Sequence, residues 1–290
     1  MNAIELANDV WHLQLLPQWG GRIGALRAAG LDLLVPISAT RFDPLAWPRG
    51  GAYPLIPYSN RLRDARLRFD GRTYALPAHP AAQPHTLHGV SHTLSWQLEA
   101  LTSTEASMAC EYAGEHWPWP VRAEQHIQLQ GNTLHLRIRL VNQGDRPMPG
   151  GIGLHPYFKR HSGMRVQWQA GREWSIDDQY LATGSSRQLQ APCQLQADTQ
   201  GTLALYHSQW DGLLQIDYPQ GCLSLHASAP LEHFVAFAPA DAPYLCLEPV
   251  SHLADAFNSL EQDWASTGAR RIEPGAALEA SLRFTWQPSL

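Results

Sequence analysis

Two residues of this sequence, His155 and Glu248, stand in settings that suit proton-transfer chemistry. His155 lies in the stretch GGIGLHPYF, and in an extended chain it shares one face with Gly151, Gly153 and Tyr157. Glycines leave the backbone uncovered, so we expect room for a ligand beside the histidine. The imidazole titrates near neutral pH, which makes it suitable for donating or accepting a proton.

Glu248 lies near the end of the stretch YLCLEPVSH. Alternation places it on the same face as Tyr244 and Cys246, and places Leu245 and Leu247 on the other face. Glutamate is rarely fully buried without a partner, so a carboxylate at the end of an apolar strand needs an explanation. The alternative to a chemical role is an ion pair with an arginine at a sheet edge.

Two further stretches place polar residues beside strand-like apolar ones. Asn60 and Arg61 follow YPLIPYS, and His88 precedes Gly89 in HTLHGVSH. Each has an ordinary alternative, because a histidine is often a satisfied structural residue and a loop arginine is often solvated. These stretches therefore gain meaning only in combination with the other two.

We expect no metal site and no cysteine redox motif. His85, His88 and His92 could be described as a metal cluster, but Pro84 and Gly89 interrupt a helix there and no His-Glu-x-x-His spacing occurs. The cysteines stand far apart and form no Cys-x-x-Cys pair, which is typical of buried apolar thiols. They are Cys110, Cys193, Cys222 and Cys246.

The composition argues against several classes of partner. The chain has 290 residues, a formal net charge of −5 and 16% charged residues, so it offers no basic surface for nucleic acid. No apolar run approaches the roughly 18 residues of a membrane span, and no secretory signal opens the sequence, so we expect a cytoplasmic protein. The 11 Trp and 9 Tyr supply flat apolar faces with polar handles, which suit a sugar ring.

The elements that must position these residues are predicted to be strands. Short alternating runs recur throughout, separated by Gly, Pro, Asn and Asp, whereas a helical period is rarely sustained. We expect tight hairpins at Asp70-Gly71 and at Gly131-Asn132, and a short helix or turn over 259–267. The absence of repeats and linkers favours one domain over 1–290, an all-β, large antiparallel β-sandwich with a concave face for a ligand. The alternating runs cover 10–17, 65–77, 124–143, 212–228 and 277–287.

In combination, these motifs resemble the aldose 1-epimerase (galactose mutarotase) family. The family carries an Asn-Arg in its first third, a His-Gly before midchain, a His-Pro-Tyr-Phe about halfway and a Leu-Glu late in the chain. In this sequence they stand in the same order and span most of the chain. They are Asn60-Arg61, His88-Gly89, His155-Pro156-Tyr157-Phe158 and Leu247-Glu248.

The resemblance implies a large β-sandwich that interconverts the α and β anomers of a free aldose without a cofactor. Glu248 would be the base that takes the proton from the C1 hydroxyl, and His155 the acid that protonates the ring oxygen. Arg61, His88 and Asn60 would bind the sugar. By the same resemblance, the ligand would be a monosaccharide. We expect the protein to be a monomer or a homodimer.

The sequence departs from the family at a loop where an aspartate usually binds sugar hydroxyls. The family's Asp-His-Asn-Phe motif is missing here. Trp210 and Asp211 occupy roughly that part of the chain and are candidates for a sugar contact, although Asp211-Gly212 is equally consistent with a plain turn.

Three alternatives remain open. A relative that acts on hexose 6-phosphates would keep the acid and base and add a cationic pocket, which Arg61, Arg63, Arg66 and Arg68 could supply. A sugar-binding or sugar-sensing protein without catalysis would not need both His155 and Glu248. An accessory domain of a glycoside hydrolase would belong to an enzyme with two carboxylates at the scissile bond, and only one good candidate is found here.

Overall fold

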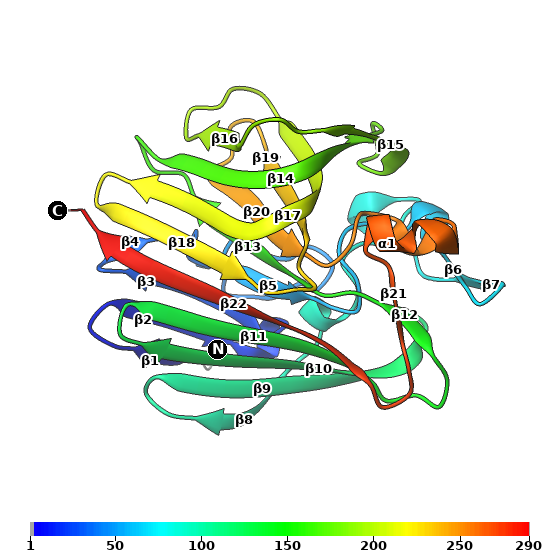
Figure 1. Ribbon diagram of the computed structural model, residues 1–290. Helices are drawn as coiled ribbons and strands as arrows, with labels where there is room; N and C mark the ends of the chain where they lie inside the picture. Colours follow the sequence, from blue (N-terminus) through cyan, green and yellow to red (C-terminus); the bar gives the residue numbers. More distant parts are fainter. Residues whose placement is uncertain (1–2, 290) are drawn as a thin grey trace.

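The structure, a computed structural model, describes residues 3–289 and consists mainly of antiparallel strands (Figure 1). The strands of the first half are β1 (Ile4–Ala7), β2 (Trp11–Leu16), β3 (Arg22–Ala28), β4 (Leu31–Asp32), β5 (Ala52–Leu55), β6 (Arg66–Phe69), β7 (Arg72–Ala75), β8 (Gln97–Leu101), β9 (Glu105–Gly114), β10 (Trp117–Gln130) and β11 (Thr133–Asn142). Those of the second half are β12 (Met148–Gly150), β13 (Gly153–Lys159), β14 (Arg165–Ile176), β15 (Ala182–Gln188), β16 (Cys193–Gln196), β17 (Leu203–Tyr218), β18 (Gly221–Ala227), β19 (His233–Ala238), β20 (Tyr244–Val250), β21 (Arg270–Ile272) and β22 (Ala277–Pro288).

Helical structure among the described residues is limited to short segments. The 3-10 helices are η1 (Pro17–Trp19), η2 (Arg63–Ala65), η3 (Pro80–Ala82), η4 (Ser91–Thr93), η5 (Ala256–Asn258) and η6 (Glu261–Asp263), and the α-helix is α1 (Trp264–Thr267). The last two confirm the short helix or turn predicted near 259–267. Within residues 3–289, no helix combines the length and the apolar composition that crossing a membrane requires.

The strand pairings arrange the sheet in two layers (Figure 1). In one layer β9, β10, β11, β22 and β18 pair in that order. In the other, β2, β3, β5, β13, β20 and β19 pair in that order. The long strand β17 joins both layers, because residues 213–218 pair with β18 and residues 203–208 pair with β19. This arrangement is the antiparallel β-sandwich that the sequence predicted.

Alternating burial accounts for the core between the layers. In β11, Leu134, Leu136, Ile138 and Leu140 are all almost completely buried, whereas the residues between them are partly or fully exposed. The period of two in the sequence therefore corresponds to one face turned into the core and one turned out.

Both predicted two-residue hairpins are confirmed. Phe69 pairs with Arg72 across Asp70-Gly71, and β10 and β11 pair across Gly131-Asn132. Asp70 and Gly71 both have positive φ, 48° and 71°, as the twist of a tight hairpin requires.

Candidate active site

His155 of β13 and Glu248 of β20 stand opposite each other on paired strands. The register pairs Gly153 with Val250, and two residues further along each strand it brings His155 level with Glu248. On its other side, β13 pairs with β5, and His155 is opposite Tyr53. Residues about 95 positions apart in the sequence are thus brought together by strand register alone.

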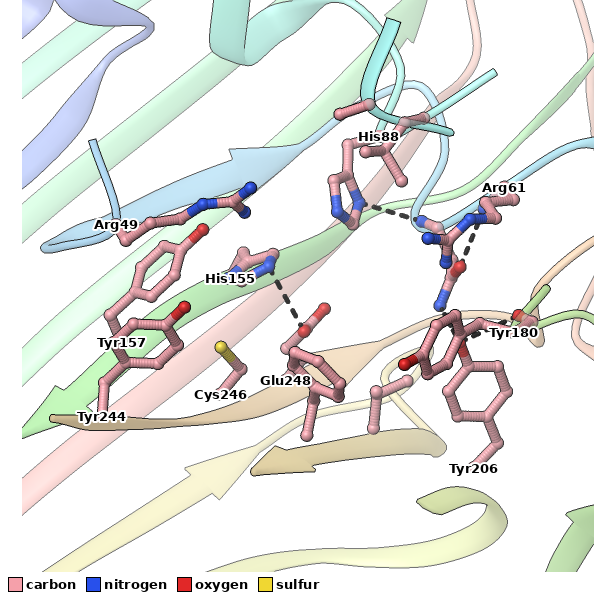
Figure 2. Close-up of a pocket in the computed structure, with 15 residues that line it drawn as sticks. Arg49, Arg61, His88, His155, Tyr157, Tyr180, Tyr206, Tyr244, Cys246 and Glu248 are labelled. Atoms are coloured by element: carbon pink, nitrogen blue, oxygen red, sulfur yellow. Dashed lines mark hydrogen bonds and ion pairs between the residues drawn. The ribbon is translucent and has the colours of Figure 1, made fainter. Parts of the chain in front are cut away.

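The two side chains contact each other at the base of a cavity of about 200 Å³ (Figure 2). His155 Nε2 lies 3.4 Å from Glu248 Oε1, and the residues are only 6% and 4% exposed. The imidazole stacks on the rings of both Tyr53 and Tyr157, with centroids 4.8 and 4.7 Å away, and these two rings are 6.3 Å from each other. These rings hold the imidazole plane fixed, so its Nε2 edge faces the carboxyl group. The cavity is lined by Arg49, Asn60, Arg61, Ala81, Leu87, His88, His155, Tyr157, Tyr180, Tyr206, Val235, Phe237, Tyr244, Cys246 and Glu248.

Burial shifts the two groups in opposite directions. Burial raises the pKa of Glu248 to about 8, and the nearby Arg61 opposes this shift only in part. Burial lowers the pKa of His155 to about 3, and the positive charges of Arg22 and Arg49 act in the same direction. The sequence-based expectation of a raised pKa for this carboxyl is therefore in the right direction. At neutral pH the pair holds one proton, which resides on the carboxyl group.

Arg22 of β3 is a buried cation that interacts with aromatic rings. None of its side-chain nitrogens has a hydrogen-bond partner among the described residues, and the residue is 0% exposed. Its guanidinium lies 4.1 Å from the ring centroid of Tyr53, and the rings of Phe42 and Trp47 lie 5.3 and 5.9 Å away. Tyr53 also stacks on His155, and the positive charge of Arg22 lowers the pKa of that histidine, so this cation disfavours a second positive charge on the imidazole.

Two hydrogen bonds hold His88 and Asn60 together, one between their backbones and one from the Asn60 backbone to the His88 ring. The Asn60 N–H donates to His88 Nδ1 at 3.1 Å, and the His88 N–H donates to the Asn60 carbonyl at 2.8 Å. Since Nδ1 accepts a hydrogen bond, the proton of the neutral ring is on Nε2, which makes Nε2 a donor. Burial holds the pKa of His88 well below its usual range, and electrostatic repulsion from His155 is the next largest cause. Both residues have left-handed backbone, with φ of 60° and 61°, a strain often found at functional sites.

Asn60 is occupied by protein contacts. Its Nδ2 donates to Tyr206 Oη at 2.8 Å, and its Oδ1 accepts from the Arg61 N–H at 2.9 Å. Tyr206 Oη in turn donates to the Tyr180 carbonyl. Asn60 therefore orients the loop that carries Arg61.

The guanidinium of Arg61 is directed toward the cavity (Figure 2). It lies 5.0 Å from the ring centroid of Tyr180, and no carboxylate among residues 3–289 forms an ion pair with it. The next arginine, Arg63, is engaged elsewhere, with Asp177 at 3.0 Å and Asp255 at 3.7 Å. Of the two, Arg61 alone is placed to contact a ligand in the cavity.

The expectation that two glycines make room for a ligand is wrong. A Cβ on Gly151 would lie 2.0 Å from His252 Cδ2, and one on Gly153 would lie 2.8 Å from Val250 Cγ1. The space above these glycines is filled by protein side chains from around β20. His252 Nε2 accepts a hydrogen bond from the Ser59 N–H at 3.1 Å. Gly151 thus acts indirectly, because it admits the histidine that supports the loop before Asn60.

The structure does not bring Trp210 and Asp211 to the cavity. Trp210 is buried against Phe234, with ring centroids 4.9 Å apart, and its indole N–H donates to the Leu213 carbonyl. Asp211 Oδ1 accepts from the Leu213 N–H at 2.9 Å, the pattern of an aspartate-stabilised turn. Asp211-Gly212 is not a separate turn, because both residues lie within strand β17 at an irregularity in its pairing with β14. Neither Trp210 nor Asp211 lines the cavity, so the predicted sugar contacts are wrong.

Several lining residues were missed by the sequence analysis. Tyr157, Tyr244 and Cys246 line the cavity, and alternation had already placed them on the same faces as His155 and Glu248, so they could have been predicted. Arg49, Tyr180 and Tyr206 show no comparable signal. Arg49 and Tyr180 come from loops and Tyr206 comes from strand β17, and only the tertiary structure brings them together.

The cavity also contains one set of metal-binding residue types. Ligand atoms of His155, Cys246 and Glu248 lie within 4.8 Å of one another, whereas His85, His88 and His92 form no such group within the described part of the chain. Burial raises the pKa of the Cys246 thiol well above its usual range. Because a thiol binds metal as the thiolate, this set is a poor zinc site at neutral pH. The absence of a metal remains a prediction.

Known proteins share both the sequence pattern and the fold. The protein-family model described as aldose 1-epimerase matches residues 4–285. An uncharacterized protein of Escherichia coli, YphB, is 28% identical over 250 residues, which cover 81% of this chain and 83% of that protein. The crystal structure of a putative aldose 1-epimerase from Escherichia coli has a TM-score of 0.86 at 23% identity, with 99% of each chain covered. A galactose mutarotase-like protein from Clostridium acetobutylicum has a TM-score of 0.85 at 17% identity, with 99% of this chain and 95% of that chain covered. The chain therefore belongs to the aldose 1-epimerase family.

Proposed function

We propose that this protein interconverts the α and β anomers of an aldose by general acid and base catalysis. The observation that supports this proposal is the buried His155–Glu248 contact of 3.4 Å at the base of a cavity. The cavity volume of about 200 Å³ is below that of typical drug-sized ligand pockets, and it suits a single monosaccharide.

The reaction moves one proton between the two side chains. To open the ring, His155 in its protonated form gives a proton to the ring oxygen, while Glu248 takes the proton of the C1 hydroxyl. The C1–ring oxygen bond breaks, and a C1 aldehyde and a C5 hydroxyl form. Because the proton of the pair rests on Glu248, it first moves across the 3.4 Å contact to His155, and opening returns it to Glu248 by way of the sugar. Rotation about C1–C2 and the reverse transfers close the ring as the other anomer.

The remaining polar groups hold the sugar in place. His88 Nε2 and Arg61 are donors at the cavity wall, and they would bind ring hydroxyls or the ring oxygen. Arg61 would also stabilise negative charge that develops on oxygen as a proton leaves. Among the lining residues Glu248 is the single carboxylate, which supports an epimerase over a glycoside hydrolase with two carboxylates.

Polarimetry on freshly dissolved α-D-glucose and α-D-galactose tests this function. We expect the wild-type protein to accelerate the decay of optical rotation above the buffer rate for at least one aldose. Each positioned proton transfer is typically worth about 10²–10⁴ in rate, so the acceleration is measurable at micromolar enzyme. No acceleration with any neutral or charged aldose would reject the proposal in favour of a sugar-binding protein.

The shared proton predicts the pH dependence of kcat/KM. The pair holds one proton between the pKa of His155, about 3, and that of Glu248, about 8. Above about pH 8 this proton is lost, and the rate falls about tenfold per pH unit. We therefore expect an enzymatic rate, corrected for the buffer rate, that is level from about pH 5 to 7 and falls above pH 8. A rate that falls from pH 7 to pH 5, as for a free histidine base, would contradict the shared-proton mechanism.

A further inference from the structure

Arg49 lines the cavity and has no acidic partner. Its guanidinium is directed toward the cavity from the loop before β5, beside Tyr157 (Figure 2). It lies 5.8 Å from the ring centroid of Trp47, and the ion pairs found among residues 3–289 do not include it. Tyr157 is a hydrogen-bond partner of Arg49, and no carboxylate of the described chain compensates the charge of this guanidinium. An arginine without an acidic partner at a ligand cavity is suited to bind an anion.

The proposed chemistry fixes which part of the sugar faces Arg49. In an aldopyranose the ring oxygen is bonded to C1 on one side and to C5, which carries C6, on the other. If His155 serves the ring oxygen and Glu248 serves the C1 hydroxyl, C2 and C3 extend beyond Glu248 toward Arg61. C5 and C6 then extend beyond His155 in the opposite direction, where Figure 2 shows Arg49.

The charge of the cavity is positive. Its lining contains the cations Arg49 and Arg61 and the single acid Glu248. Burial raises the pKa of Glu248 to about 8, so at neutral pH the carboxyl is mostly uncharged, and burial holds His88 and His155 neutral. A neutral sugar would leave both positive charges uncompensated, whereas an anionic sugar would neutralise one of them.

We propose that the preferred substrate is an aldose with an anionic group at C6, a carboxylate or a phosphate, and that Arg49 binds this group. This inference rests on the proposed epimerase function and names its substrate class. The 6-phosphate alternative of the sequence analysis assigns the cationic pocket to other arginines, and Arg49 is not among them. Of the arginines considered there, Arg63 is paired with Asp177 and Asp255, and Arg66 and Arg68 are exposed on the β6–β7 hairpin outside the cavity lining.

Exchange NMR at anomeric equilibrium tests the proposal without pure anomers. The α–β exchange rates of D-glucose, D-glucuronate and D-glucose 6-phosphate are measured with wild-type protein. We expect kcat/KM for at least one anionic aldose to exceed that for glucose by about ten- to hundredfold, the range of a hydrogen bond to a charged group. The two anionic sugars differ in reach, so the faster one identifies the group as carboxylate or phosphate.

The Arg49→Gln variant is expected to remove this preference. The ratio of kcat/KM for the better anionic aldose to that for glucose should fall about ten- to hundredfold, and Arg49→Lys should restore part of it. Arg68→Gln is the matched control, because it removes one positive charge from the exposed hairpin, and it should leave the ratio unchanged. Equal rates for glucose and both anionic sugars in wild type, or an unchanged ratio in Arg49→Gln, would overturn the inference while the epimerase function stands. Exchange of none of the three sugars would instead reject the epimerase function itself.

Discussion

The Glu248→Gln variant is expected to lose about 10²–10⁴ of its catalysed rate in anomer interconversion. Glutamine has the same shape as glutamate, but its amide cannot take the C1 hydroxyl proton or return it. The lining of the cavity contains no other carboxylate, and burial raises the pKa of the neighbouring Cys246 thiol well above its usual range. No neighbour can therefore replace Glu248 as the base.

The same substitution should leave the fold intact. In the resting protein the pKa of Glu248 is about 8, so at neutral pH the carboxyl is mostly uncharged and an amide replaces a group of similar polarity. We expect an unchanged circular dichroism spectrum and a melting temperature within a few degrees of wild type. Glu261→Gln, at an exposed position outside the cavity, is the control and should keep full activity. A Glu248→Gln variant within threefold of the wild-type rate would remove Glu248 from the mechanism.

The pair His155–Glu248 could be predicted from the sequence only as two separate residues. Alternation within each stretch gives the face on which each side chain stands, and that information is local. Their contact depends on the register of β13 against β20, which depends on strand order and on the packing of both layers. Family resemblance supplied the pairing that local patterns did not contain.

The errors of the sequence analysis have the same physical origin. The glycine pattern predicts free space above Gly151 and Gly153, but His252 and Val250, about 100 residues later in the chain, fill it. A glycine in a sequence shows that a side chain is missing and gives no information on what occupies the space. For the same reason Arg49, in a loop without periodicity, could be identified only once the loop was placed beside β13.

The row of cross-strand neighbours gives Arg22 a role that no motif indicates. Ile23 pairs with Ala52, so Arg22 and Tyr53 stand level on β3 and β5, and the row continues through His155 to Glu248. The Tyr53 ring contacts both of its neighbours in this row, with its centroid 4.1 Å from the Arg22 guanidinium and 4.8 Å from the centroid of the His155 imidazole. A fixed cation at the end of this row disfavours a charged imidazole and so favours the proton on the carboxyl group, and its effect is strong because buried charges are little screened.

The His155→Asn variant is expected to reduce the catalysed rate about as much as Glu248→Gln, by about 10²–10⁴. Asparagine keeps a polar side chain but cannot protonate the ring oxygen. Since one proton passes between the two residues, removing either one stops the cycle. We therefore expect the double variant with Glu248→Gln to be no slower than the slower single variant, as found for residues that act as a unit.

Loss of packing must be separated from loss of chemistry in His155→Asn. The imidazole packs against the rings of Tyr53 and Tyr157, so the smaller asparagine leaves a gap and should lower the melting temperature. His233→Asn is the matched control, because His233 is also a buried histidine and lies outside the cavity lining. It should lose stability to a similar extent but keep its rate at a temperature where both variants are folded. If His155→Asn and His233→Asn lost activity equally, the loss would come from packing and His155 would have no part in the chemistry. If the double variant with Glu248→Gln were slower by the product of the single effects, His155 and Glu248 would not share a proton. The mechanism would then require a separate acid and base.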